Sequence, residues 1–219
     1  MSSPLEIDQL IVPLIDGYTI LDVGCGWGKW GSLIRTCWYR TTRGKGDTIP
    51  RLLIGADLFR PSLKRVKSHK IYDDVVLCHA AFLPFREDIV DVVLAIEMLE
   101  HIAKTEGTKV LNELEQVSKE TVIVSTPHLS PYREGTMSPE GFNPYDAHIS
   151  KWSVKDFKAK DYSVIGSGFC INGQSIPIMK VLLAPLSFFF PIFGCYLIAV
   201  KKRSKKQSLG QLLKKLYPM

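Results

Sequence analysis

Three glycines in the stretch ILDVGCGWGKWG could bring a ligand close to the backbone: Gly24, Gly26 and Gly28. They follow a short β-branched run that contains Asp22, and a helical pattern follows them. A residue without Cβ adopts positive φ freely, and the unpaired amides of a helix N-terminus favour a polar or anionic group. The stretch predicts a nucleotide-type ligand, and a turn that only closes a sheet is the alternative.

A carboxylate stands at the end of the next apolar run. Asp57 follows residues 51–56, which have the pattern of a strand. In an open parallel sheet, ligands bind at the carboxyl ends of the strands where the strand order reverses. We therefore expect Asp57 to accept hydrogen bonds from both hydroxyls of a ribose, unless it only caps the following helix.

Three histidines are candidates for a general base: His101, His128 and His148. Imidazole is the usual base when the nucleophile is a phenol or another hydroxyl. His128 follows a strand end and His148 lies in a long loop, so these two are predicted to meet a substrate, whereas His101 is expected to be structural. A capping or hydrogen-bonding role is the alternative for each. No group of residues has metal-ligand spacing along the chain, so no metal is predicted.

A sheet must position these residues, and the hydrophobic pattern predicts one. Strand patterns alternate with helical ones, which predicts an α/β fold: a Rossmann-like, doubly wound, mostly parallel seven-stranded sheet with helices on both faces. The run 89–96 is apolar on both faces, as expected in the middle of a parallel sheet. The predicted strands are residues 19–23, 51–56, 75–78, 89–96, 121–125, 162–169 and 195–201, the last beside an edge strand.

The helices and the longest loop complete this organisation. Ser3, Pro4 and Glu6 form the pattern of a capping box at the start of a first helix. Residues 128–151 are rich in Pro, Gly and Tyr and show no period, and a loop this long is usually functional or mobile. The other predicted helices cover residues 30–38, 61–70 and 109–118, with a short one capped by Ser153 and Asp156.

The composition is that of an ordinary globular protein, with 46% hydrophobic and 23% charged residues. The net charge of +6 comes from the C-terminal end, because residues 201–219 contain seven basic residues and no acidic one. The five cysteines are widely spaced, which favours free thiols in a reducing compartment. The N-terminus lacks the pattern of a signal peptide, so we expect a cytoplasmic protein.

Several motifs in sequence order give residues 18–170 a resemblance to the class I S-adenosylmethionine-dependent methyltransferases. The glycines have the GxGxG form, and Asp57 is the acidic residue after the second strand. LPF at 83–85, AIEMLEHI at 95–102, STP at 125–127 and WSVKDFKAKDYSVIGSGF at 152–169 are similar to later family motifs. The resemblance implies the cofactor S-adenosylmethionine and direct displacement of its methyl group by a nucleophile held in line.

The resemblance also implies cofactor-binding roles, residue by residue. Asp22 and Gly24 would hold the methionine end, with Cys25, Gly26 and Gly28 in the same loop. Asp57 would bind the ribose and Leu58 would pack beside the adenine. His79, Ala80 and Ala81 would edge the adenine, and Glu97 and Met98 would flank the sulfonium. His79 is a departure, because many family members have aspartate there, so the contact to the adenine amino group is in doubt.

An apolar run, residues 181–200, precedes the basic tail and contains no charged residue. Its length would suit a transmembrane helix, but Pro185, Pro191 and Gly194 interrupt a regular helix. The preferred interpretation is a hydrophobic excursion around Phe188–Phe190 and then a strand. The tail has leucines at helical spacing, so an exposed aromatic patch and a basic amphipathic helix could together bind an anionic membrane surface. The aromatics could equally belong to the core.

The sequence therefore predicts a methyltransferase domain over residues 1–200 and a basic amphipathic tail over residues 201–219. The predicted function is methyl transfer to a small-molecule or lipid-like acceptor, with peripheral membrane contact as an open alternative. Methylation of RNA or protein is a second hypothesis. Nucleic acid is the less favoured partner, because no DPPY-like motif follows the fourth strand and no aromatic residues interleave with the lysines. A methyltransferase-like binding protein without turnover is the third.

Overall fold

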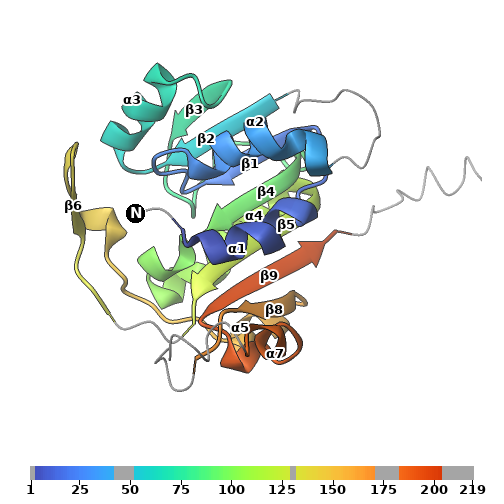
Figure 1. Cartoon of the computed structure of the whole chain (residues 1–219). Helices are drawn as coiled ribbons and strands as arrows, with labels where there is room; N and C mark the ends of the chain where they lie inside the picture. The colour runs from blue at the N-terminus through green and yellow to red at the C-terminus, as the bar shows by residue number, and fades with distance from the viewer. Residues whose placement is uncertain (1–2, 42–51, 129–131, 171–182, 204–219) are drawn as a thin grey trace, which may run out of the picture.

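One seven-stranded sheet organises the fold (Figure 1). The computed structural model describes residues 3–41, 52–128, 132–170 and 183–203. From edge to edge the strands are β3 (Asp74–Leu77), β2 (Leu52–Asp57), β1 (Thr19–Val23), β4 (Val90–Ile96), β5 (Ser118–Pro127), β9 (Tyr196–Lys202) and β8 (Ser163–Ser167). All neighbours are parallel except β9, which is antiparallel to both β5 and β8. The predicted Rossmann-like, mostly parallel seven-stranded sheet is confirmed, with its last strand next to an edge.

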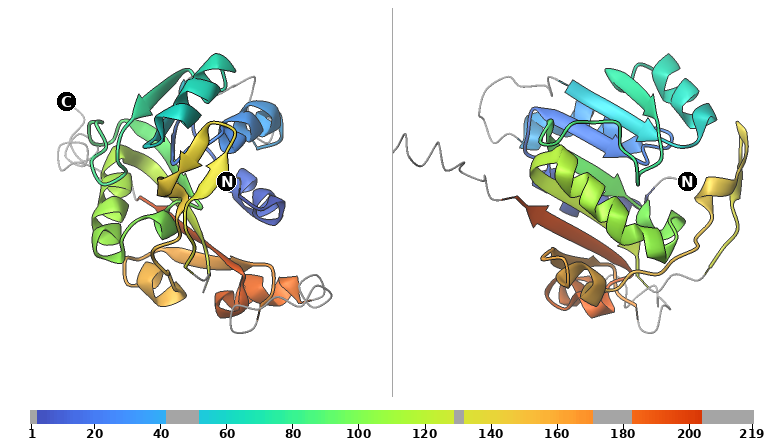
Figure 2. Two further views of the ribbon diagram at one scale, coloured as in Figure 1. Left: turned by 90° about the vertical axis from the view of Figure 1, so that its left-hand side faces the viewer. Right: turned by 180° about the vertical axis from the view of Figure 1, so that it is seen from behind.

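Helices cover both faces of the sheet (Figure 2). On one face lie α1 (Leu5–Ile11), continued by the 3-10 turn η1 (Val12–Leu14), then α2 (Lys29–Thr41) and α3 (Arg60–Ser68). The other face carries α4 (Lys104–Val117) and α5 (Val154–Lys158). Each face has its own hydrophobic core, and β4 contributes buried side chains to both. The predicted position of this strand in the middle of the sheet is therefore confirmed.

The start of the chain differs from the predicted capping box. Helix α1 begins at Leu5 with Pro4 as its N-cap, and no side chain caps it. The Ser3 hydroxyl instead accepts hydrogen bonds from Lys29 Nζ at 3.0 Å and Trp30 Nε1 at 3.1 Å. The competing donors on α2 therefore use the oxygen that the local pattern assigned to α1. The capping box of Ser153 and Asp156 on α5 does form.

The segment 128–151, which has no period in the sequence, contains a small hairpin. Strands β6 (Thr136–Ser138) and β7 (Gly141–Asn143) pair antiparallel, and the 3-10 turn η3 (Pro144–Asp146) follows them. Strands of three residues are too short to show an alternating pattern. The hairpin lies at the end of the sheet where the parallel strands terminate (Figure 2, left).

The described part of the apolar run forms short elements: α7 (Ala184–Phe189), the turn η4 (Pro191–Phe193) and the beginning of β9. Among the residues that the structure describes, no helix is both long and apolar enough to cross a bilayer. The aromatic side chains here are exposed, with 75% of Phe189 and 55% of Phe190 accessible, so they are not core. The amphipathic helix predicted after residue 203 lies outside the described residues.

The cysteines agree with the prediction of free thiols wherever their side chains are described. Cys25, Cys78, Cys170 and Cys195 are unbridged. Cys37 lies outside the residues whose side chains are described.

Helix α4 begins five residues before the predicted start, and Gly107 explains why the pattern hid its first turn. A glycine inside a helix weakens the sequence signal, but here it makes room for an aromatic ring. A Cβ at this position would lie 2.2 Å from Trp152. The ring is held in place because Trp152 Nε1 donates to Leu99 O at 3.2 Å and to Ser150 Oγ at 3.0 Å.

We expect Gly107→Ala to destabilise the protein although alanine is the better helix former. Overpacking against a fixed ring costs about 1–3 kcal/mol, which exceeds the roughly 1 kcal/mol gained in helix propensity. Urea unfolding should show a lower free energy of unfolding. The neighbouring exposed residue gives the control, Thr108→Ala, which should change stability by less than about 0.5 kcal/mol. Equal stability of the two variants would contradict this packing role.

Candidate functional site

A pocket of about 550 Å³ opens at the carboxyl ends of the parallel strands. One side is formed by the loop after β1 and the end of β2, and another by the end of β4 and the turn η2 (Leu99–His101). The β6–β7 hairpin and η3 close it on the side away from the sheet. The volume lies within the usual range for a site that binds one small ligand or cofactor.

The glycine loop after β1 is fixed by the end of β2. Gly24 N and Cys25 N both donate to Ala56 O, at 2.8 and 3.0 Å. All three glycines have positive φ. At Gly24 a Cβ would lie 2.6 Å from Met98 Cγ, whereas at Gly26 the nearest atom to a Cβ is 4.0 Å away. Gly26 therefore leaves open space beside the backbone, as a ligand lying against it requires.

Asp57 ties this loop to the end of β2. Its Oδ2 accepts from Gly26 N at 2.8 Å and its Oδ1 accepts from Phe59 N at 2.7 Å. Burial raises the pKa of Asp57, although these amides favour the ionised form. Each oxygen of a carboxylate can accept a second hydrogen bond. Asp57 can therefore still receive a pair of ligand hydroxyls.

Glu97 closes the end of β4 in a strained backbone conformation, with φ of 52°. Ser125 holds its side chain, because Ser125 Oγ donates to Glu97 Oε1 at 2.7 Å. Burial raises the pKa of Glu97 to about 7. A residue kept in a rare conformation at a pocket wall is a candidate for a functional role.

Comparison with known proteins agrees with this geometry. The family described as methyltransferase domain matches residues 21–125. Over these residues the chain carries a domain similar to the S-adenosylmethionine-dependent methyltransferases. The predicted family, enzyme class and cofactor are thereby confirmed for this domain.

Individual relatives are distant. A tRNA (carboxymethyluridine(34)-5-O)-methyltransferase of Arabidopsis thaliana is 28% identical over 67% of this chain and 33% of its own length. An uncharacterised protein of Methanocaldococcus jannaschii is 26% identical over 68% of this chain and 57% of that protein. The chain thus spans just over half the length of one of these curated relatives and a third of the length of the other. The solved S-adenosylmethionine-dependent methyltransferase of Mesorhizobium loti shares the fold, with a TM-score of 0.54, 14% identity and coverage of 90% of this chain and 98% of that one.

Most of the residues that the resemblance assigned to the methyltransferase cofactor meet at this one pocket. Asp57 at the end of β2 and Glu97 just after β4 line it, and His79 lines it from the segment after β3. The others in its wall are Gly24, Cys25, Gly26, Leu58, Ala80 and Met98. Gly28 and Ala81 do not line it: Gly28 provides space for Ile71 and Val66, and Ala81 is fully buried in the core.

Asp22 also lies outside the pocket lining, which does not support its predicted role at the methionine end. It is 1% exposed, and its Oδ2 accepts from the Tyr72 hydroxyl at 2.5 Å. Successive side chains of a strand point to opposite faces, and on β1 this direction is the face covered by α2 and α3. Burial raises the pKa of Asp22 to about 7.

The two histidines predicted to be catalytic, His128 and His148, do not line the pocket. His128 is buried at the end of β5, with Nδ1 at 3.1 Å from Gly194 O. His148 packs edge-on against His101 at 5.0 Å between ring centroids. His101, expected to be structural, is the histidine that reaches the pocket. Its Nδ1 lies 2.9 Å from Ala147 O, so this nitrogen carries the hydrogen.

Burial lowers the pKa of both members of this histidine pair. For His101, the contacts to Ala147 O and Asp146 oppose the shift. For His148, burial and then the charge of Arg133 lower the pKa to about 4. Both imidazoles are therefore neutral at neutral pH.

Sequence reasoning missed the second half of the pocket wall. The hairpin contributes side chains from both of its strands, and Tyr145 and Asp146 follow from η3. Ser3 and Lys29 contribute from the N-terminal side. The aperiodic length of 128–151 was a signal for a functional segment, but no pattern within it shows which side chains face a ligand.

The raised pKa of Asp22 predicts a pH effect on stability. The folded state holds this proton up to about pH 7, while the unfolded chain releases it near the ordinary pKa of 3.8. Between these two pH values the folded state binds more protons than the unfolded chain. The free energy of unfolding therefore falls as pH rises through this range. Urea unfolding at pH 5 and pH 8 should show that wild type loses more free energy of unfolding than Asp22→Asn, by the order of a few kcal/mol.

Wild type and Asp22→Asn share all their other carboxylates. The pH dependence that Glu97 and Glu100 add to the free energy of unfolding is therefore the same in both proteins. An equal loss in wild type and variant would mean that Asp22 is ionised in the folded state throughout this range.

Proposed function

We propose that this chain transfers a methyl group from S-adenosylmethionine to a small-molecule acceptor that reaches the pocket beneath the β6–β7 hairpin. The single observation that carries the proposal is the two-sided pocket. Asp57 and the open backbone at Gly26 form one side, and Glu97, His101 and Asp146 form the other. Cofactor and acceptor can therefore meet at the end of β4.

The residues present suit this cofactor. Gly26 has no obstacle within van der Waals contact where a Cβ would stand, so a chain of ligand atoms fits against the loop. Asp57 keeps acceptor capacity for ribose hydroxyls. Leu58, His79 and Ala80 line the same pocket and would flank the adenine. His79 Nδ1 accepts from Ala81 N at 3.1 Å, so a contact to the adenine amino group would come from another atom.

The cofactor supplies an already activated methyl group, so the main task of the protein is alignment. Met98 and Glu97 are fixed at the end of β4, beside the glycine loop. Their fixed positions favour one orientation of the bound ligand. The wall opposite Asp57 offers His101 and Asp146 as polar contacts for an acceptor. His128 and His148 gain no support as bases from their positions.

A second candidate acceptor is a nucleoside in RNA. Trp27, Met137 and Tyr145 line the pocket and are 39%, 78% and 50% exposed. The flat rings of Trp27 and Tyr145 can stack on an unpaired base, and Arg65 lies over Trp27 at 4.9 Å. The Arabidopsis relative is named as a tRNA methyltransferase. These observations keep RNA as an alternative to a free small molecule.

A lipid-like acceptor at a membrane surface is supported by a different feature. Phe188, Phe189, Phe190 and Phe193 are between 38% and 75% exposed around α7. Exposed aromatic residues favour the membrane interface. This patch packs on β8, at the edge of the sheet. Contact of the patch with a membrane would therefore leave the pocket unchanged.

Cofactor binding tests the assignment of Asp57. Asp57→Asn removes the negative charge and one of the two acceptor oxygens while keeping the shape, so we expect binding of S-adenosylmethionine to weaken roughly 10- to 100-fold. Isothermal titration calorimetry measures the change. Asp74→Asn, at an exposed position on β3, is the matched control and should bind as wild type does. The ribose role is wrong if the two variants bind equally.

The acceptor side can be tested independently. Tyr145→Ala should raise the KM for the acceptor about tenfold through loss of an aromatic contact, with cofactor affinity unchanged. Phe142→Ala is the control, because Phe142 is exposed on the same hairpin and does not line the pocket. The acceptor is first identified with radiolabelled S-adenosylmethionine and separate small-molecule, lipid, protein and RNA fractions. Label confined to the RNA fraction would favour RNA as the acceptor. Binding of S-adenosylmethionine without transfer of label to any fraction would favour a methyltransferase-like binding protein without turnover.

A further inference from the structure

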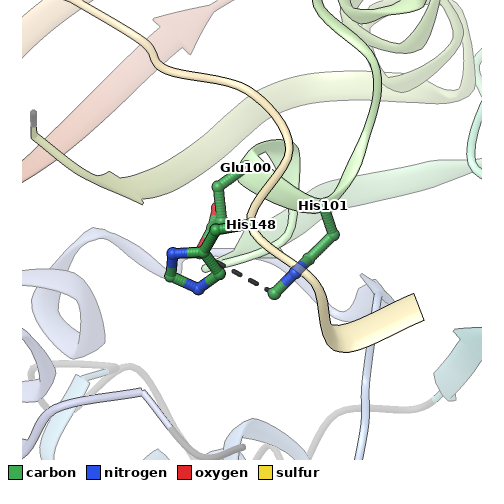
Figure 3. Close-up of side chains that lie close together, drawn as sticks. All are labelled: Glu100, His101 and His148. Atoms are coloured by element: carbon green, nitrogen blue, oxygen red, sulfur yellow. Dashed lines mark ion pairs between the residues drawn. The ribbon is translucent and has the colours of Figure 1, made fainter. Parts of the chain in front are cut away.

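Three potential metal ligands converge at the pocket wall, although the sequence spacing gave no sign of them. Oxygen of Glu100 and ring nitrogens of His101 and His148 all lie within 4.8 Å of one another (Figure 3). Glu100 and His101 belong to η2, while His148 comes from the segment after the hairpin. The separation of 47 positions between the histidines is why no motif predicted the group.

The tautomer of His101 points its lone pair into this group. A carbonyl can only accept, so the contact of Nδ1 with Ala147 O at 2.9 Å places the ring hydrogen on Nδ1. Nε2 then faces two carboxylates, at 3.9 Å from Glu100 Oε1 and 3.8 Å from Asp146 Oδ1. Acceptor atoms turned toward one another repel unless a proton or a cation lies between them. Metal-binding histidines commonly donate their other N–H to a backbone carbonyl in this way.

The local charge also favours a cation. Glu100 is 2% exposed and Asp146 is 7% exposed. Arg133 lies 3.8 Å from Asp146 Oδ2 and supplies one positive charge near two carboxylates. A buried carboxylate is costly unless it is neutralised. A bound cation facing Glu100 would remove this cost and would also be compatible with neutral imidazoles.

Hydrogen bonds to the backbone carbonyls of η2 hold the two segments together, so the convergence is not a contact of loose side chains. Ile149 N and Ser150 N both donate to Glu100 O, at 2.9 and 3.1 Å. Ser150 Oγ and Trp152 Nε1 both donate to Leu99 O, at 3.1 and 3.2 Å. His148 is therefore fixed directly beside η2.

We propose that Glu100, His101 and His148 bind a divalent first-row transition-metal ion such as Mn²⁺, Co²⁺ or Zn²⁺. Two imidazole nitrogens and one carboxylate suit these ions better than Mg²⁺ or Ca²⁺, which prefer oxygen ligands. With metal–ligand bonds of about 2.1 Å, the ligand atoms must approach to roughly 3–3.5 Å. The ligand atoms, which lie within 4.8 Å of one another, must therefore draw closer when the ion binds.

The site would lie at the acceptor side of the pocket, because His101 and Asp146 line it. Three protein ligands leave coordination positions for an oxygen of the acceptor, whose pKa the ion would lower. Binding of the ion is independent of the proposed function, whereas this role toward the acceptor rests on it.

Metal binding by the full chain, stripped with a chelator, tests the proposal. Titration with Co²⁺ should give visible d–d absorption and a stoichiometry of one ion per chain, and calorimetry with Mn²⁺ and Zn²⁺ should agree. His148→Ala should weaken binding at least about tenfold, and His148→Gln serves if the first variant does not fold. The control is His69→Ala, at an exposed position after α3, which should bind as wild type does.

The proposal is overturned if wild type binds no ion, if His148→Ala and His148→Gln both bind as tightly as wild type, or if His69→Ala loses as much affinity. Binding of S-adenosylmethionine is measured on the same samples, and we expect His148→Ala to retain it. Cofactor binding without metal binding contradicts the metal site alone, and metal binding without cofactor binding contradicts the proposed function alone.

Discussion

The parallel pairing of β1 with β4 is the constraint on which the rest of the molecule depends. The two strands are adjacent in the sheet, but the chain continues from β1 to helices on one face and from β4 to α4 on the other. The segments that follow their carboxyl ends therefore diverge and leave a crevice between them. Asp91 fixes the opposite end, where its Oδ2 accepts from Tyr18 N and Thr19 N at 2.8 and 2.9 Å. With one end locked, the glycine loop and Glu97 have fixed positions at the other.

The second half of the site depends on contacts that are distant in sequence. Trp152 fills the space left by Gly107 and donates to Leu99 O, which attaches the segment after the hairpin to η2. That attachment brings Asp146 to the pocket and His148 to His101. The first half of the pocket is thus set by the sheet, and the second half by the packing of one aromatic ring.

This division explains what the sequence could predict. The strands, the glycine loop and Asp57 have local signals, because alternation, turn chemistry and strand ends are encoded over a few residues. Asp22 has the same local signal, but the alternation of β1 turns it toward Tyr72, which is 50 positions away. Ser3 was expected to cap α1 and binds Lys29 and Trp30 instead, since donors from another helix are closer to its hydroxyl. The reach of His101 to the pocket and its contact with His148 depend on tertiary packing, which no spacing in the chain records.

The buried carboxylates near the pocket lower the stability of the folded protein, and the binding of a ligand explains how this cost is offset. Burial raises the pKa of Asp57, Glu97 and Glu100, so each of these groups is harder to ionise in the folded protein than in water. Such groups lower stability at neutral pH unless a positive charge comes close. S-adenosylmethionine carries a sulfonium and an ammonium group, and a divalent metal ion is more strongly positive still. A ligand of either kind favours the ionised forms and binds only the folded state, so its binding energy offsets the destabilisation that the empty pocket imposes. The unfavourable burial of acid is then part of how the site selects cationic ligands.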